Sequence, residues 1–242
     1  MKISNYNKNN IIRKIDHGCE ATIYLYKDNG EEVALKIYFD KNEEANNNKE
    51  LKIQILQNES ILKNDMHILS RVYSNGKFIG FTSKYEPYMP LSFLDSREQK
   101  INLLRLIKNR YEELNEHGIY IGDFNIDNFS LENGRIKLFD IDNFRIDDLD
   151  FNIVDTAMIE YRERCKFIYK IDYYCFNWFA LSLLSGIETD AIIRDIGRDD
   201  FPRFLKTPEI KDFIKKLDDF DDTTIIERTS NGKPKTLLNL LK

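Results

Sequence analysis

Short apolar runs alternate with polar turns in the first third of the chain, a pattern typical of β-strands. These runs cover residues 11–15, 21–26, 32–39, 68–73 and 78–85. Asp28-Asn29-Gly30 separates the second run from the third, and Ser74-Asn75-Gly76 separates the last two. Asn-Gly between two such runs favours a tight hairpin. The pattern therefore predicts a β-rich first third.

The spacing of apolar residues changes to a helical period at several later places. A short helix is predicted from residue 50, after a polar stretch, and a long amphipathic helix from 97 to 117, where Gly118 ends it. A strongly apolar helix is predicted at 172–184. Two further helices are predicted at 210–217 and 235–241.

The change of pattern predicts an α+β protein with two lobes that together form one domain. Residues 1–86 would form a small antiparallel β lobe with one main helix, and residues 87–242 a larger helical lobe. The segment 86–90 carries two prolines and is typical of a connector. A junction between two lobes is a place where ligands usually bind.

Composition narrows the class of protein. The chain has 242 residues, 42% of them hydrophobic and 32% charged, which is typical of a soluble globular protein. Its net charge of −5 argues against nucleic-acid binding. We found no apolar run long enough to span a membrane, so we expect no membrane span. The three cysteines lack metal-like spacing, so we expect reduced thiols in a cytoplasmic protein. The oligomeric state is left open.

The strongest chemical motif combines Asp123, Asn128 five residues later, and Asp140 beyond a strand–turn–strand. Phosphoryl transfer needs a carboxylate beside the attacking hydroxyl and oxygen ligands for Mg²⁺. This spacing resembles the catalytic loop and the metal-binding Asp-Phe-Gly motif of protein kinases. The sequence departs from that pattern in two places: Ile121-Gly122 stands where the family has His-Arg, and Asp140-Ile141-Asp142 where it has Asp-Phe-Gly.

A second resemblance lies in the first third. Val33-Ala34-Leu35-Lys36 is similar to the kinase strand whose lysine contacts the α- and β-phosphates of ATP. Residues 15–24 resemble the Gly-rich loop, with Gly18 at its one retained glycine. The resemblance implies that Ile23 and Ala34 contact the adenine. It also implies a helix glutamate that orients Lys36.

That glutamate is predicted to be Glu50, with Glu59 as the alternative. In the last part of the chain, Asp172 resembles the aspartate that opens the central helix of kinases and holds the backbone of the catalytic loop. Glu160, twelve residues earlier, resembles the glutamate that ends the activation segment, and Arg228 its arginine partner. The resemblance covers residues from about 11 to 241 and predicts a Glu160–Arg228 ion pair.

The chain is thus identified by resemblance as protein-kinase-like, similar to bacterial Ser/Thr protein kinases. The resemblance implies that Lys36 contacts the phosphates of ATP, that Asn128 and Asp140 bind Mg²⁺, and that Asp123 is the catalytic base. The sequence does not settle whether Asp142 also binds the metal.

The phosphoryl acceptor remains open. Ser/Thr kinases carry a lysine two residues after the catalytic aspartate, where this chain has Asn125. Gly122-Asp123 is also similar to aminoglycoside and choline kinases. Three functions therefore compete: a protein kinase acting on Ser/Thr hydroxyls, a kinase acting on a small hydroxyl-bearing substrate, and a pseudokinase that binds a nucleotide or a partner without phosphoryl transfer.

Overall fold

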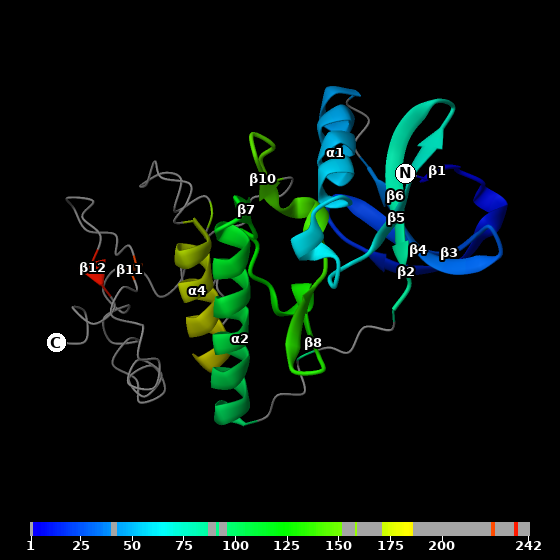
Figure 1. Cartoon of the computed structure of the whole chain (residues 1–242). Coiled ribbons are helices and arrows are strands. Elements are labelled where there is room, and N and C mark those ends of the chain that lie inside the picture. Colours follow the sequence, from blue (N-terminus) through cyan, green and yellow to red (C-terminus); the bar gives the residue numbers. More distant parts are fainter. Residues whose placement is uncertain are drawn as a thin grey trace. The chain divides into compact units, whose positions relative to one another are not determined.

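The structure is a computed structural model of the whole chain. It describes residues 2–39, 43–86, 91, 96–151, 158, 171–185, 224–225 and 235–236. These residues form a mixed α+β protein with a six-stranded sheet (Figure 1). The chain divides into two compact units, one made of Met1–Met89 and Asn128–Ile153, the other of Pro90–Asp127 and Val154–Lys242. Residues 128–153 thus belong to the first unit, although the sequence pattern predicted them in the second lobe.

The six-stranded sheet belongs to the first unit and has the order β1-β5-β6-β4-β3-β2. Its strands are β1 (Lys2–Asn5), β2 (Ile11–His17), β3 (Ala21–Asp28), β4 (Glu31–Tyr38), β5 (Ile68–Ser74) and β6 (Lys77–Lys84). β1 runs parallel to β5, and all other neighbours are antiparallel. Five of the six strands agree with the predicted runs, and β1 was not predicted.

The two predicted hairpins are present. Asn29 and Gly30 join β3 to β4, and Asn75 and Gly76 join β5 to β6. All four residues have a positive φ, the conformation that a two-residue hairpin turn requires and that asparagine and glycine adopt most easily. Local turn chemistry therefore sets the register of both hairpins.

Opposite faces of β4 have different roles, since side chains alternate along a strand. One face contributes Val33 and Leu35 to an apolar core with Tyr26 and Val72. The other face presents Lys36, which is 7% exposed. The helix α1 (Glu43–Leu56) packs against β5 and β6 (Figure 1).

A separate two-stranded hairpin in the first unit consists of β8 (Phe129–Glu132) and β9 (Arg135–Leu138), followed by the short 3-10 helix η5 (Ile141–Asn143). Asp65, a buried residue that follows the 3-10 helix η2 (Ser60–Leu62), accepts a hydrogen bond from the Leu138 backbone N–H at 2.9 Å. The Met66 N–H donates to the Leu138 carbonyl at 3.0 Å. These bonds fix the end of β9 beside the segment that precedes β5.

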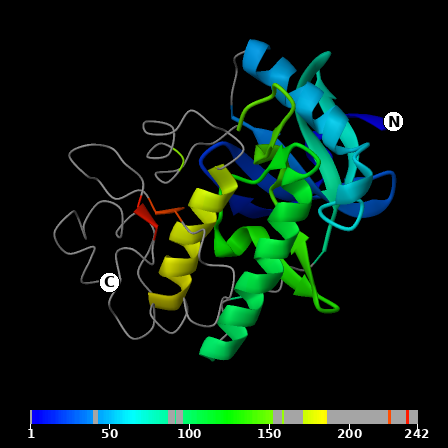
Figure 2. The same ribbon diagram turned by 60° about the vertical axis from the view of Figure 1, so that its left-hand side comes forward.

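The second unit is built around α2 (Arg97–Asn115) and α4 (Ile171–Ser185), which lie side by side (Figures 1 and 2). Both agree with predicted helices. Ser96 and Gln99 form a capping box at the start of α2. Aromatic rings fill the space beside β7 (Ile119–Tyr120) and the loop after it: Tyr111, Phe124, Phe176 and Phe179.

Two predicted helices have other outcomes. Residues 210–217 lie outside the described part of the chain. The helix predicted at 235–241 is wrong at its first two residues, because Lys235 and Thr236 form β12, which pairs with β11 (Thr224–Ile225).

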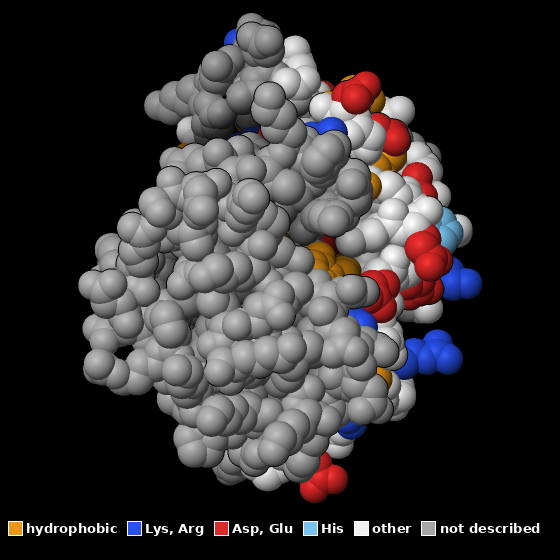
Figure 3. All heavy atoms as spheres, turned by 90° about the vertical axis from the view of Figure 1, so that its left-hand side faces the viewer, with side chains coloured by type: hydrophobic (Ala, Val, Ile, Leu, Met, Phe, Trp, Pro, Cys, Tyr) orange, Lys and Arg blue, Asp and Glu red, His pale blue; other side chains and the backbone are white. Residues whose placement is uncertain are grey.

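The described surface shown in Figure 3 mixes acidic and basic side chains, with only small hydrophobic areas between them. Within the described residues, no helix has both the length and the apolar character needed to cross a membrane.

Candidate functional site

Lys36 lies near the end of β4, on a face that it shares with Ile23 and Ala34. Ile23 is directly opposite Lys36 in the β3–β4 register, and Ala34 precedes Lys36 by two residues. Residues opposite each other across an antiparallel pair, and residues two apart along a strand, point to the same face. Ile23 and Ala34 are both partly exposed. The structure therefore brings these three predicted site residues to one partly open surface.

Asn128 and Asp140 lie at the two ends of the β8–β9 hairpin. The Phe139 N–H donates to the Asn128 carbonyl at 2.9 Å, so the antiparallel pairing places Asn128 beside the residue that precedes Asp140. Asp140 has a left-handed backbone with φ of 54°, which aspartate tolerates better than most residues do. The chain turns at this residue from β9 into η5.

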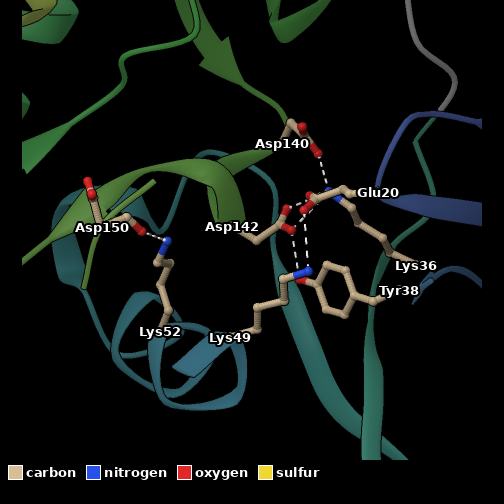
Figure 4. Close-up of polar contacts among 8 residues, drawn as sticks. All are labelled: Glu20, Lys36, Tyr38, Lys49, Lys52, Asp140, Asp142 and Asp150. Atoms are coloured by element: carbon tan, nitrogen blue, oxygen red, sulfur yellow. Dashed lines mark hydrogen bonds and ion pairs between the residues drawn. The ribbon is translucent and has the colours of Figure 1, made fainter. Parts of the chain in front are cut away.

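Lys36 meets three carboxylates from distant parts of the sequence (Figure 4). Its Nζ atom lies 2.5 Å from Asp140 Oδ1 and 2.9 Å from Asp142 Oδ2. Glu20 Oε1 lies 3.2 Å away. The Tyr38 hydroxyl, on the same face of β4, donates to Asp142 Oδ2 at 2.7 Å. All five residues belong to the first unit.

We call this group, together with Lys49 and Lys52 of α1, the lysine–carboxylate cluster. Lys49 lies 3.6 Å from Glu20 Oε2 and 4.5 Å from the centre of the Tyr38 ring, a cation–π contact. Lys52 is 2% exposed and donates to the backbone carbonyl of Asp150. Three lysines and three carboxylates therefore share one largely buried site, and their formal charges balance.

Burial and mutual attraction oppose each other in this cluster. Burial alone would lower the pKa of Lys36, but Asp142, Asp140 and Glu20 raise it above its usual value. Burial also raises the pKa of Asp140 to about 6, although Lys36 acts in the opposite direction. The pKa of Asp142 is lowered despite burial, because Lys36 and Tyr38 stabilise its charged form. Burial lowers the pKa of Lys52 to about 8.

The ion pair expected between Lys36 and a helix glutamate is not formed. Glu50 Oε1 instead accepts hydrogen bonds from Arg71 and Tyr73 of β5, each at 2.5 Å. Among the described residues, neither Glu50 nor Glu59 is a carboxylate partner of Lys36. The expectation failed because α1 turns Glu50 toward β5 and turns lysines, not acids, toward the cluster.

Asp123 and Asp172 belong to the second unit. Asp172 is fully buried at the start of α4, where its two oxygens accept hydrogen bonds from the backbone N–H groups of Ile121 at 2.8 Å and Gly122 at 2.7 Å. With its nitrogen facing Asp172, the Asn115 amide adds a third donor at 2.8 Å.

This contact is the one that the resemblance implied for Asp172. It fixes the backbone immediately before the partly exposed Asp123. Burial raises the pKa of Asp172 to about 7, while the two backbone donors act in the opposite direction.

The remaining predicted residues are Gly18, Glu160 and Arg228. Gly18 lies in the exposed turn between β2 and β3, where its N–H donates to the Ala21 carbonyl at 3.0 Å. A Cβ atom at Gly18 would meet only that carbonyl, at 3.9 Å, so the turn itself does not require glycine. Glu160 and Arg228 lie outside the described residues, and so does their predicted ion pair.

Sequence reasoning missed Glu20, Tyr38, Lys49 and Lys52. Two signals in the sequence pointed to the last three. Tyr38 follows Lys36 by two residues and so shares its face of a strand. Lys49 and Lys52 are spaced with Ile53 along one stripe of a helix, a place where apolar residues are expected. Nothing local marked Glu20.

Within the described residues, no group of three or more His, Cys, Asp or Glu side chains is arranged to hold a metal ion by itself. Mg²⁺ in phosphoryl-transfer sites is bound by one or two carboxylates together with substrate phosphates. Asp140 fits that requirement, because its side chain is 30% exposed and because burial, only partly offset by Lys36, disfavours its charged form, which a bound metal ion would stabilise. Asn128, at the other end of the hairpin, could supply an amide oxygen.

No protein-family model matches the chain, and a search of curated proteins found no match.

Proposed function

We propose that the chain is an ATP- and Mg²⁺-dependent phosphotransferase of protein-kinase-like fold that phosphorylates Ser or Thr hydroxyls of proteins. One observation carries the proposal: Lys36 and Asp140, 104 residues apart in the sequence, meet at 2.5 Å within the first unit. A lysine on a strand and an aspartate after a strand–turn–strand are the two groups that hold phosphates and Mg²⁺ in protein kinases.

The surroundings of Lys36 support this assignment. Its strand is the third of an antiparallel series, β2, β3 and β4, and a helix follows, as in the lobe that the resemblance implies. Ile23 and Ala34 would contact the adenine, because they lie on the same face of the sheet as Lys36. Asp140 and Asn128 would hold Mg²⁺, which neutralises charge on the phosphates when it is bound.

The resemblance implies that Asp123 is the catalytic base. In phosphoryl transfer the base accepts the proton of the acceptor hydroxyl while the hydroxyl oxygen bonds to the γ-phosphorus. The bond from that phosphorus to the β–γ bridging oxygen breaks, and ADP leaves. Asp172 supports this role, because its hydrogen bonds to Ile121 and Gly122 hold the backbone next to Asp123.

A second function is favoured by a specific observation. Three carboxylates already surround Lys36, and α1 turns two lysines toward the cluster where a kinase carries a glutamate. A phosphate group would have to compete with these carboxylates for Lys36. This arrangement favours a pseudokinase that binds a nucleotide or a partner without phosphoryl transfer.

Transfer of labelled γ-phosphate in the presence of Mg²⁺, to the protein itself, to generic protein acceptors and to small hydroxyl compounds, separates these functions. We expect label that disappears in Asp123→Asn and in Asp140→Asn, and that persists in Asp148→Asn, the same change at an exposed carboxylate. ATP binding without transfer to any acceptor would indicate the pseudokinase. Transfer to small hydroxyl compounds alone would indicate a small-molecule kinase. The absence of both transfer and ATP binding would refute the proposal.

A further inference from the structure

A lysine that contacts ATP phosphates needs a carboxylate to hold its ammonium group in place, because the lysine side chain is long and flexible. In protein kinases a helix glutamate has this role. Here Glu50 contacts β5, and the cluster side of α1 carries Lys49 and Lys52. The positioning group therefore has to come from another element.

Three carboxylates contact Lys36, and they differ in burial. The side chain of Asp142 is 1% exposed, compared with 14% for Glu20 and 30% for Asp140. An ion pair shielded from water is held more tightly than one that water and salt can reach. By this criterion Asp142 is the firmest partner of Lys36.

Asp142 is itself held in place on both sides. Its Oδ1 atom accepts a hydrogen bond from Lys36 at 3.0 Å, and its Oδ2 atom accepts one from the Tyr38 hydroxyl at 2.7 Å (Figure 4). The Tyr38 ring is buried beside Phe78 and Phe81, with centroids 6.1 and 6.3 Å away. Asp142 also lies in η5, whose three residues are all buried. A carboxylate fixed in this way can fix a lysine in turn.

Asp140 and Asp142 therefore differ in what they can still bind. Asp140 keeps part of its side chain open to solvent, so it can receive a ligand from outside. Asp142 has both oxygens engaged by buried groups of the first unit, which leaves it poorly placed to bind a metal ion.

We infer that Asp142, fixed by the Tyr38 hydroxyl, is the positioning residue for Lys36, in place of the helix glutamate of kinases. The inference rests on the proposed function in one respect, namely that Lys36 contacts ATP phosphates. The contact between Asp142 and Lys36 does not depend on that function.

The test compares Asp142→Asn, Tyr38→Phe and Glu50→Gln in the full chain, with Asp148→Asn as the charge-matched control. One readout is the rate at which an amine-acylating reagent labels Lys36 without nucleotide, measured by peptide mass spectrometry. The other is the Kd for ATP with and without Mg²⁺. Melting curves check that each variant is folded. If Asp142→Asn does not fold, Tyr38→Phe still tests the inference, because it removes a single oxygen atom and is the milder change.

We expect Asp142→Asn to speed labelling of Lys36 and to weaken ATP binding, each by about tenfold, because a hydrogen bond between charged groups is lost. Tyr38→Phe should act in the same direction by about three- to fivefold, the effect of losing one hydrogen bond. Glu50→Gln and Asp148→Asn should change either readout by less than about twofold, as substitutions away from the contact do.

Three results would overturn the inference. The first is unchanged labelling of Lys36 in both Asp142→Asn and Tyr38→Phe. The second is an effect of Glu50→Gln as large as that of Asp142→Asn. The third is that Asp142→Asn weakens ATP binding when Mg²⁺ is present but not when it is absent, which would make Asp142 a metal ligand. If the wild type binds no ATP, the proposed function fails, and the labelling rates still decide whether Asp142 positions Lys36.

Discussion

Replacing Lys52 by methionine should stabilise the protein at neutral pH. Lys52 is 2% exposed, and burial lowers its pKa from 10.5 to about 8. Since a tenfold change in proton affinity corresponds to about 1.4 kcal/mol, holding the proton on Lys52 in the folded chain at pH 7 costs about 3 kcal/mol. Methionine has a similar length and carries no charge.

The variant also loses a favourable contact. Lys52 donates a hydrogen bond to the Asp150 carbonyl, and a bond of this kind contributes about 1 kcal/mol. The net gain in the free energy of unfolding at pH 7 should therefore be about 2 kcal/mol for Lys52→Met.

The gain should depend on pH in a defined direction. The folded-state pKa of Lys52 is lowered, so between pH 8 and 10.5 the unfolded chain holds a proton that the folded chain has released. The stability of the wild type therefore rises with pH across this window. The advantage of the variant should shrink over the same window and be lost by about pH 10.5.

Urea unfolding followed by far-UV circular dichroism, at pH 7, 8, 9 and 10, measures the difference between the two proteins. Lys49→Met is the matched control, because it makes the same change one turn earlier on α1. It should not stabilise the protein, since it removes the contact between Lys49 and Glu20. A Lys52→Met variant that is less stable at pH 7, or a gain that stays constant to pH 10, would refute the reasoning.

Three further predictions concern stability. Gly80→Ala should destabilise the first unit by about 3 kcal/mol or more, because a Cβ atom would lie 1.9 Å from the backbone oxygen of Lys36, and an unchanged urea midpoint would contradict this. Asp172→Asn should cost about 1–3 kcal/mol, because one of two buried backbone donors loses its acceptor, and faster amide exchange in the loop before Asp123 would report it. Ser96→Ala should cost about 1 kcal/mol through loss of the cap of α2, and an equal melting temperature would exclude this.

Much of the fold could be predicted because the signals are local. Short apolar runs and Asn-Gly turns predicted β3, β4, β5 and β6, whose bounds lie within two residues of the predicted ones. The helical period and Gly118 predicted α2. β1 was missed because it is only four residues long and pairs in parallel with β5, where each partner lies 68 residues further along the chain (Lys2 with Ser70, for example). No local pattern marks a pairing at that distance.

The features of the candidate site also fall into two groups, those that local sequence signals predicted and those that depend on tertiary packing. The sequence by itself determined that Lys36 lies in a strand, that Asp140 follows a hairpin, and that Asp172 opens a helix, because each follows from residue type and spacing. Only the tertiary structure decided which carboxylate meets Lys36. Glu20, Glu50, Asp140 and Asp142 carry equal formal charges in the sequence, but Coulomb attraction depends on distance and on exclusion of water. Packing fixes both, and it brings Asp142 to Lys36 while it turns Glu50 toward β5.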